Sequence, residues 1–148
     1  MSEQVFHFSC DWPGGRNAVA EIHCGALQTR ASIPASMEGP GVGTNPDEML
    51  LSAAASCYLM TLAAMIERAE LKVAELALDS ELVLDMQRGG YRCQRITHRP
   101  RLRLDPRTSA ADRRKLEHLL SMAERRCMIS RALRGNVEIM VEPYMDRA

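Results

Sequence analysis

The feature that most constrains the fold of this 148-residue chain is an uncharged run at residues 49–66. Helix-start signals precede it. Asn45 is suited to cap the first turn, and Pro46 is suited to the first helical position because its missing N–H would have no partner there. Asp47 and Glu48 place negative charge at the positive end of the helix dipole, and Glu48 completes a capping-box spacing with Asn45. A helix that is apolar on all sides is expected to be buried in a core or an interface.

The same run reaches the lower length limit for a membrane span. Much of it, however, is Ala, Ser, Thr, Cys or Tyr, and no basic residue flanks its start, so we expect a packed helix and no membrane partner. The first residues lack the charged-then-apolar pattern of a signal peptide. The five cysteines form no metal-type spacing such as CxxC, and their odd number indicates reduced thiols. We therefore expect a cytoplasmic protein.

Size and charge favour one ordinary globular domain over residues 1–148, with 46% hydrophobic and 26% charged residues. Nineteen basic and nineteen acidic residues cancel, so the composition indicates no nucleic-acid partner. Aromatic residues are scarce at 4%, whereas the chain has ten methionines, so the core is expected to consist of aliphatic, Ala and Met side chains.

The order of expected elements predicts an α+β fold. Strand-like alternation occurs on both sides of the central helix, in residues 4–10, 18–23, 27–33, 73–86, 91–104 and 137–141. Residues 88–90 form an expected hairpin turn, and residues 38–43 form a glycine-rich loop that leads to the central helix. Ser109 is expected to cap a second helix, with Cys127 extending the apolar stripe of that helix.

Five arginines in the predicted strand 91–104 resemble a nucleic-acid patch: Arg92, Arg95, Arg99, Arg101 and Arg103. Because the whole chain is neutral, a solvated strand face with balancing acids is the favoured interpretation.

Cys57 lies in the middle of the apolar helix, and Cys127 lies on the apolar side of the second one. Both are compatible with plain core packing, which is the usual place of a buried free cysteine. Both are also compatible with thiol chemistry, and Arg16 in the turn WPGGR is a candidate cation that would lower a thiol pKa. The other cysteines (Cys10, Cys24, Cys93) and the histidines (His7, His23, His98, His118) form no ligand pattern, and we expect no metal.

The residues around both cysteines resemble the OsmC/Ohr family of thiol peroxidases. The segment GTNPDEMLLSAAASCY is similar to the first-cysteine motif of that family, and AERRCMISRALRGNVEI is similar to its second-cysteine motif. The turn WPGGR resembles the family's GGR, which carries an arginine. The resemblance spans the chain from its first turn to its last strand. It implies an OsmC-like fold of antiparallel sheets around a buried central helix, with a second cysteine-bearing helix, in an intertwined homodimer.

The resemblance also implies roles for five residues. Cys57 would attack a hydroperoxide as the thiolate and become a sulfenic acid, and Cys127 would condense with it to a disulfide. Arg16 would hold the thiolate and polarise the peroxide, with Asp47 or Glu48 as the carboxylate of the site. No cofactor is implied, because an external thiol or dithiol would reduce the disulfide. The implied activity is reduction of organic, and also inorganic, hydroperoxides in the oxidative stress response.

The chain departs from the family pattern at two positions. Asp47 stands where the family usually has Glu, so the carboxylate is one methylene shorter. Met128 follows Cys127 where the family commonly has Pro, which changes the backbone beside the resolving thiol.

Helix geometry gives an independent reason to expect a dimer. Asp47 and Cys57 are ten residues apart on one expected helix, or about 15 Å along its axis. If both serve one site, the carboxylate comes from the partner chain or moves on a flexible arm.

Two other functions remain open on the residues alone. One is a Cys/His hydrolase or acyl transferase with Cys57 as nucleophile and His98 or His118 as base. The other is a non-catalytic dimer that senses redox state or binds an apolar ligand. A hydrolase would not need Cys127, and a sensor would be oxidised once without turnover.

Overall fold

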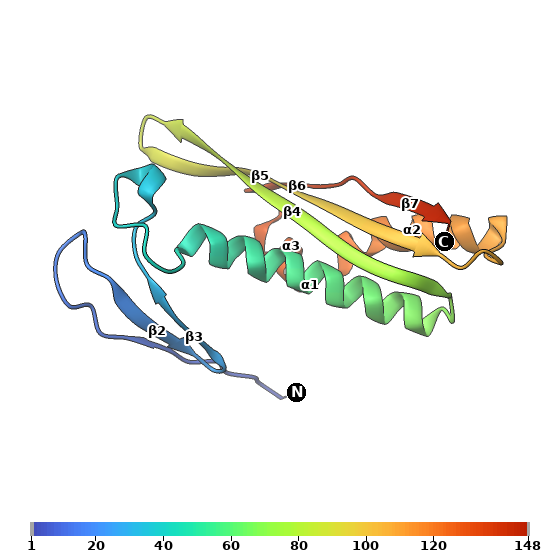
Figure 1. Cartoon of the computed structure of the whole chain (residues 1–148), viewed down its shortest axis with the longest axis horizontal. Helices are drawn as coiled ribbons and strands as arrows, with labels where there is room; N and C mark the ends of the chain where they lie inside the picture. Colours follow the sequence, from blue (N-terminus) through green and yellow to red (C-terminus); the bar gives the residue numbers. More distant parts are fainter. Residues whose placement is uncertain (1, 148) are drawn as a thin grey trace. The chain divides into compact units, whose positions relative to one another are not determined.

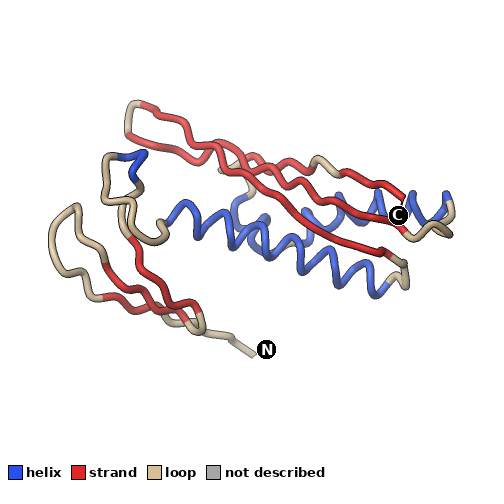
Figure 2. Tube along the Cα trace, in the orientation of Figure 1, coloured by secondary structure: helices blue, strands red, loops and turns tan. Residues whose placement is uncertain are grey.

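A computed structural model describes residues 2–147 and divides them into two compact units. Residues up to Leu50 form the N-terminal unit, and residues from Leu51 form the C-terminal unit. Each unit has its own β-sheet (Figures 1 and 2), and helices complete the C-terminal one. The α+β class predicted from the sequence is therefore confirmed.

The N-terminal unit is built on a three-stranded antiparallel sheet in the order β1-β2-β3. Its strands are β1 (Phe8–Cys10), β2 (Ala20–Cys24) and β3 (Leu27–Ala31), and a short 3-10 helix η1 (Ala35–Met37) follows. The predicted first strand is shorter than expected, and its aromatic side chains are 82% (Phe6) and 62% (Phe8) exposed. Alternation over residues 4–10 therefore predicts the strand in part, but not one that is half-buried in this chain.

The glycine-rich loop holds the start of the central helix against β3. The backbone N–H of Thr44 donates to the Arg30 carbonyl at 2.8 Å, and the N–H of Ser32 donates to the Thr44 carbonyl at 3.0 Å. Gly43 has a φ of 71°, and a Cβ atom there would lie 2.1 Å from the Arg30 oxygen. A side chain is excluded at this position both by the backbone conformation and by the close approach of β3.

Helix α1 (Pro46–Arg68) begins where the sequence predicts it. The Asn45 side-chain oxygen accepts a hydrogen bond from the Glu48 N–H at 3.0 Å, and the Glu48 carboxylate accepts one from the Asn45 amide at 3.1 Å. The Thr44 hydroxyl donates to the same carboxylate at 3.2 Å. The capping interaction expected from the spacing of Asn45 and Glu48 is confirmed.

The sheet of the C-terminal unit is mixed, which corrects the expectation of antiparallel sheets. β4 (Val73–Gln87) and β5 (Gly90–Leu104) form the predicted antiparallel hairpin. β6 (Glu138–Val141) pairs with β5 in parallel, and so does β7 (Tyr144–Arg147), a strand that the sequence reading missed. Parallel pairing is possible because the chain between β5 and β6 is long enough to cross over as helices.

Two helices make that crossover. α2 (Ala110–Arg126) is capped as predicted, since the Ser109 hydroxyl oxygen accepts from the Asp112 N–H at 3.0 Å. The backbone becomes extended at Cys127, with φ −61° and ψ 121°, and a short helix α3 (Met128–Leu133) follows. Cys127 therefore lies between two helices, which corrects the expectation that it belongs to the second helix.

Helices α1 and α2 pack on one face of the C-terminal sheet. The main core cluster combines residues of α1 (Tyr58, Leu62, Met65, Ile66), of β5 (Leu102, Leu104) and of α2 (Leu116, Leu120, Ala123) with Cys127. The Tyr58 hydroxyl donates to the Leu120 carbonyl at 2.9 Å, so one polar bond ties α1 to α2 inside this apolar contact.

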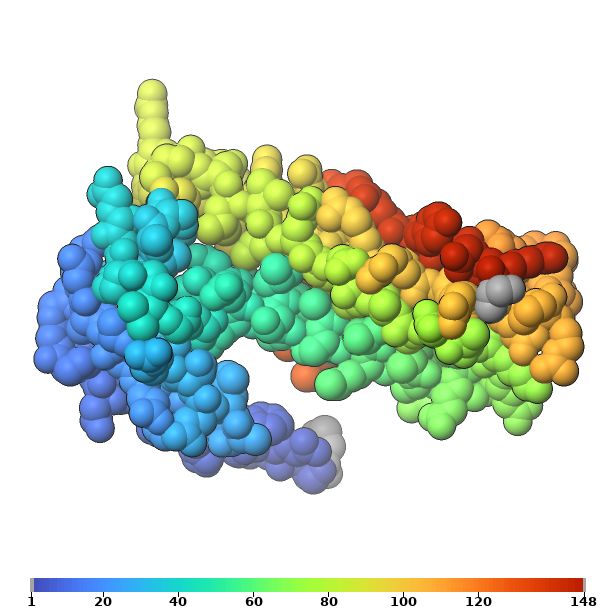
Figure 3. Space-filling view, viewed as in Figure 1, coloured from blue at the N-terminus to red at the C-terminus, as the bar shows by residue number. Residues whose placement is uncertain are grey.

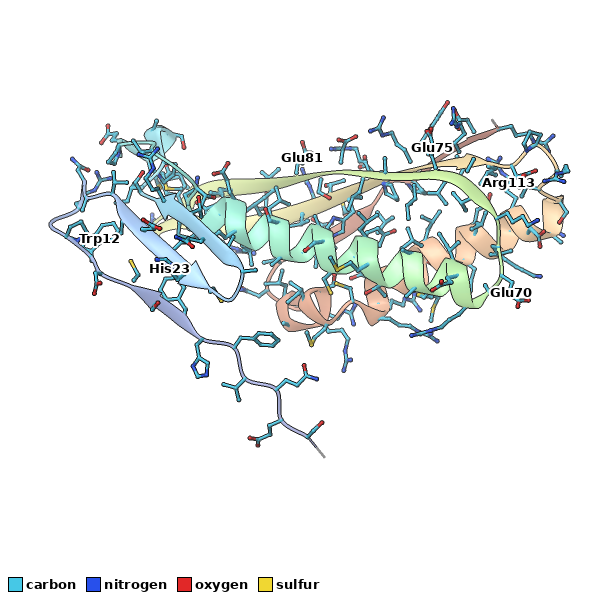
Figure 4. The ribbon with its side chains drawn as sticks, turned by 60° about the horizontal axis from the view of Figure 1, so that its bottom comes forward. Trp12, His23, Glu70, Glu75, Glu81 and Arg113 are labelled. Carbon is cyan, nitrogen blue, oxygen red and sulfur yellow. The ribbon has the colours of Figure 1, made fainter. Side chains whose placement is uncertain are left out.

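The opposite face of the sheet carries the arginine-rich row of β5. Arg99 pairs with Glu81 at 2.9 Å and with Glu142 at 3.0 Å, and Arg101 pairs with Asp79 at 3.2 Å. Arg103 pairs with Glu75, and Figure 4 shows Glu75 and Glu81 on the side of the sheet that points away from the helices. The expected solvated face with balancing acids is confirmed.

One side of α1 remains open. Met60 is 71% exposed, and Ser52, Ala53, Ser56 and Ala63 are exposed with it, so the middle of the helix is visible at the surface in Figure 3. The core of one chain therefore covers only part of this helix, and the expectation that an interface covers the rest stays a prediction. By length and by its mean hydropathy of 1.8, α1 could also cross a membrane, a test that core helices of folded proteins pass as well.

The bond between Tyr58 and Leu120 makes a measurable contribution to stability. Tyr58→Phe removes one buried hydrogen bond without a change of shape, so we expect the free energy of unfolding to fall by about 1 kcal/mol in urea titration. Tyr144→Phe is the matched control because Tyr144 is 61% exposed. Equal unfolding free energies for the two variants would contradict the role of the Tyr58 hydroxyl.

Candidate dithiol site

Cys57 and Cys127 lie next to each other in the C-terminal unit. Cys57 is half-buried in the middle of α1, and Cys127 is fully buried at the bend between α2 and α3. The thiol of Cys127 donates a hydrogen bond to the sulfur of Cys57, and both cysteines are in the free form. The fold thus places two thiols that are far apart in sequence within reach of one disulfide.

The surroundings of Cys57 favour its thiolate. Burial raises the pKa of the Cys57 thiol, but hydrogen bonds from Cys127, from the N–H groups of Ile129 and Met128 and from the Thr61 hydroxyl together outweigh it. The pKa of Cys57 is therefore lower than that of an ordinary cysteine. All of these donors belong to the C-terminal unit and none is a cation.

The surroundings of Cys127 have the opposite effect. Burial is the largest cause, and the hydrogen bond and charge of Cys57 add to it, so the pKa of Cys127 is raised. The hydroxyl and the backbone N–H of Ser130 act against this rise. Loss of the proton is thus favoured at Cys57 and disfavoured at Cys127.

The bend at Cys127 is what directs the backbone N–H groups at the thiols. α2 ends when the Cys127 N–H donates to the Ala123 carbonyl at 2.8 Å, and α3 begins when the Arg131 N–H donates to the Cys127 carbonyl at 3.0 Å. The first N–H groups of α3 have no partner inside their own helix, and those of Met128 and Ile129 donate to Cys57. Sequence reasoning missed α3 because six residues are too few for a helical period.

Arg16 lies in the N-terminal unit, where its guanidinium is held by the loop. It donates to the carbonyl of Met37 at 2.7 Å, to that of Glu38 at 3.0 Å and to the side-chain oxygen of Asn17 at 3.0 Å. Within residues 2–50, the structure does not pair Arg16 with Asp47 or Glu48.

The two candidate carboxylates differ in their surroundings. Glu48 is used in the capping interaction with Asn45 and Thr44. Asp47 forms no ion pair or side-chain hydrogen bond with any described residue of the N-terminal unit. Asp47 is therefore the carboxylate that remains available for another group.

His98, one of the two histidines considered as a base for Cys57, is fully buried on β5. Its Nδ1 lies 2.7 Å from the Ser80 hydroxyl, and its ring stacks on Tyr58 at a centroid distance of 4.8 Å. Burial lowers the pKa of His98 to about 4, so the ring is neutral at ordinary pH. His98 is not among the groups that hydrogen-bond Cys57, and His118 lies exposed on α2. This arrangement gives no support to a Cys/His hydrolase.

The described residues also show whether a metal could bind. Among residues 2–147, no group of three or more His, Cys, Asp or Glu side chains is placed to hold a metal ion.

Comparisons with known proteins agree with this fold. The family model described as OsmC-like protein matches residues 39–142, a segment that contains Cys57 and Cys127. The uncharacterized protein YmaD of Bacillus subtilis is 46% identical over 142 residues, which cover 96% of this chain and 95% of that protein. The organic hydroperoxide resistance protein of Xanthomonas axonopodis pv. citri is 27% identical over 128 residues, or 85% of each chain.

A solved structure extends the likeness to the whole fold. The organic hydroperoxide resistance protein OsmC of Legionella pneumophila matches 97% of this chain and 99% of its own with a TM-score of 0.78, at 20% identity. The matched segment covers most of the chain, and the two sheets and their helices recur in that structure. The chain belongs to the OsmC-like protein family.

Proposed function

We propose that this protein is a thiol-dependent peroxidase that reduces organic hydroperoxides through Cys57 and Cys127. The observation that carries the proposal is the hydrogen bond between the two thiols, with a lowered pKa at Cys57 and a raised pKa at Cys127. A peroxidatic cysteine must be a thiolate, and a resolving cysteine must wait until the first one is oxidised.

The proposed reaction has two steps at the protein. The Cys57 thiolate attacks the terminal peroxide oxygen, the O–O bond breaks, and the alkoxide leaves with a proton as an alcohol. The sulfur of Cys127 then attacks the Cys57 sulfenic acid: the S–S bond forms, the S–O bond breaks, and the hydroxyl leaves with the Cys127 proton as water. An external dithiol returns the disulfide to two thiols, as the reducing cytoplasm allows.

Two exposed methionines favour an apolar peroxide. Met60 stands one turn after Cys57 on α1 and is 71% exposed, and Met128 adjoins Cys127 and is 68% exposed. Flexible thioether side chains beside the thiols are suited to an alkyl group and give hydrogen peroxide no polar partner. The relatives called organic hydroperoxide resistance proteins, at 25 to 27% identity, support the same substrate class and a role in oxidative stress defence.

The proposal includes a homodimer in which Asp47 of one chain serves the thiols of the other. Asp47 and Cys57 lie on the same helix α1, about 15 Å apart along its axis, so one chain cannot easily bring both to one peroxide. Exposed apolar side chains are also frequent in both units, and they include Val5, Phe6, Phe8, Leu27, Met60 and Met86. Such surfaces are typical of an interface.

Peroxide consumption by the thiol variants tests the proposed function. With dithiothreitol as reductant, we expect Cys57→Ser to consume tert-butyl hydroperoxide at the background rate, because it lacks the nucleophile. Cys127→Ser should accumulate a sulfenic acid that dimedone traps at Cys57. Cys10→Ser is the matched control, since Cys10 is a half-buried thiol outside the site.

Turnover should be faster with tert-butyl hydroperoxide than with hydrogen peroxide at equal concentration. If wild-type protein is oxidised once and consumes no further peroxide with reductant present, the peroxidase proposal is wrong and a redox sensor replaces it.

The backbone donor at Met128 gives a second prediction. Met128→Pro removes the N–H that donates to Cys57, and proline fits here because it is the first residue of α3 and Cys127 before it is already extended. The pKa of Cys57 should rise, so the pH profile of its alkylation by iodoacetamide should move to higher pH, measured with Cys127→Ser in the background. Met128→Ala keeps the N–H and should keep the wild-type profile; matching profiles for both variants would exclude the N–H as a donor.

Subunit complementation tests the shared site. Chains with Cys57→Ser are refolded together with chains carrying Asp47→Asn and Glu48→Gln, where Gln can still cap the helix. Half of randomly formed dimers are mixed and each has one complete site, so activity should return to about a quarter of the wild-type value. Activity no higher than the sum of the separate variants, or a monomer in sedimentation, would place all groups of the site in one chain.

A further inference from the structure

Ser130 is a fully buried serine beside the reactive pair, and its hydroxyl is not used by the fold. Among residues 2–147 this hydroxyl has no nitrogen or oxygen partner. Other serine hydroxyls of the chain are bonded: that of Ser80 contacts His98, and that of Ser32 contacts the Val42 backbone. A buried hydroxyl without a partner destabilises a protein, so it calls for another explanation.

The position of Ser130 supplies that explanation. It lies in the first turn of α3, three residues after Cys127, so that its side chain and its backbone N–H face the Cys127 sulfur. A hydrogen bond from Ser130 to a neutral Cys127 thiol is weak, because a thiol sulfur is a weak acceptor. A thiolate at the same place would be a strong acceptor, because hydrogen bonds to an ionised group are shorter and stronger.

The second step of the proposed reaction requires that thiolate. In the reduced protein Cys127 gives its hydrogen bond to Cys57, and burial disfavours loss of its proton. Once Cys57 carries a sulfenic acid, Cys127 must attack through its sulfur while its proton leaves with the hydroxyl of Cys57 as water. Negative charge then develops on a sulfur inside an apolar core, where few groups can donate to it.

We propose that Ser130 is the donor that stabilises the Cys127 thiolate in the disulfide-forming step. In the reduced protein no nitrogen or oxygen atom of residues 2–147 competes for this hydroxyl, so it is free to donate fully to Cys127 when the charge appears. This inference rests on the proposed peroxidase function, and it assigns Ser130 to the second step and not to the attack on the peroxide.

The two steps are separated by oxidising reduced protein with one equivalent of tert-butyl hydroperoxide in the absence of reductant. Sulfenic acid at Cys57 and the Cys57–Cys127 disulfide are then followed by rapid quenching and mass spectrometry. In Ser130→Ala, sulfenic acid should form at the wild-type rate, and the disulfide should form about tenfold to a hundredfold more slowly. Ser80→Ala is the control, because it removes a hydroxyl of the same unit that contacts His98 instead of a thiol.

Two further measurements distinguish this role from a structural one. Ser130→Ala removes a buried hydroxyl that has no nitrogen or oxygen partner among residues 2–147, so its melting temperature should equal or exceed that of wild type. In a Cys57→Ser background, which lacks the titratable group whose charge acts on Cys127, Ser130→Ala should move the alkylation profile of Cys127 to higher pH. The sign follows because loss of a donor to the thiolate raises the thiol pKa.

Each outcome decides one proposal. Wild-type disulfide rates in Ser130→Ala, or a destabilised variant in which both steps slow together, would overturn the role of Ser130. If oxidised wild-type protein contains neither a Cys57 sulfenic acid nor a Cys57–Cys127 disulfide, the peroxidase function is overturned instead. In that case the alkylation profile of Cys127 still tests the Ser130 hydroxyl as a donor to that thiolate.

Discussion

The dithiol site depends on the packing of one side of α1 against β5 and α2. Tyr58 and Leu62 are fully buried in that contact, and the Tyr58 hydroxyl bonds to the Leu120 carbonyl of α2. Cys57 precedes Tyr58 directly, so the contact that fixes the ring also fixes the height and rotation of the thiol. The bend at Cys127 ends α2 beside the same helix turn and brings the second thiol and the first N–H groups of α3 to it. Packing of uncharged side chains around Tyr58 and Leu62 therefore positions the two thiols, Cys57 and Cys127.

The arrangement makes two chemically identical side chains different. Burial acts against the thiolate at both sulfurs, yet the donors around them are unequally shared. Cys57 receives the thiol of Cys127, two backbone N–H groups and a threonine hydroxyl, whereas Cys127 has only the groups of Ser130. The hydrogen bond between the thiols increases the difference, because it lowers one pKa and raises the other. In the proposed two-step reaction, this unequal distribution of donors is the reason for the order in which the two thiols react.

Long elements with a strong pattern could be predicted from the sequence, and short ones could not. The capped start of α1, the β4–β5 hairpin and the Ser109 cap were each readable from local spacing. α3 and β7 were missed because segments this short have no reliable period and are held by tertiary contacts. Alternation along β6 shows a strand, but its parallel pairing depends on the crossover and is invisible to the pattern.

The candidate site was likewise predicted only in part. Motif similarity pointed to Cys57 and Cys127, but nothing in the sequence marks Ser130 except a hydroxyl three residues after a cysteine.

Because the donors to Cys57 are neutral groups, Arg16 is not needed to lower the pKa of this thiol. A guanidinium beside the thiol was the expected reason for a low pKa, yet neutral donors of the C-terminal unit already lower the pKa of Cys57. Met128 contributes to this because, unlike proline, it has an N–H to donate. In the N-terminal unit the Arg16 guanidinium donates to the carbonyls of Met37 and Glu38, and these two hydrogen bonds fix its orientation. Among residues 2–50 no carboxylate pairs with this guanidinium, and a fixed cation of this kind is suited to a peroxide oxygen on which charge develops. That Arg16 polarises a peroxide stays a prediction, and the lowered pKa of Cys57 does not depend on it.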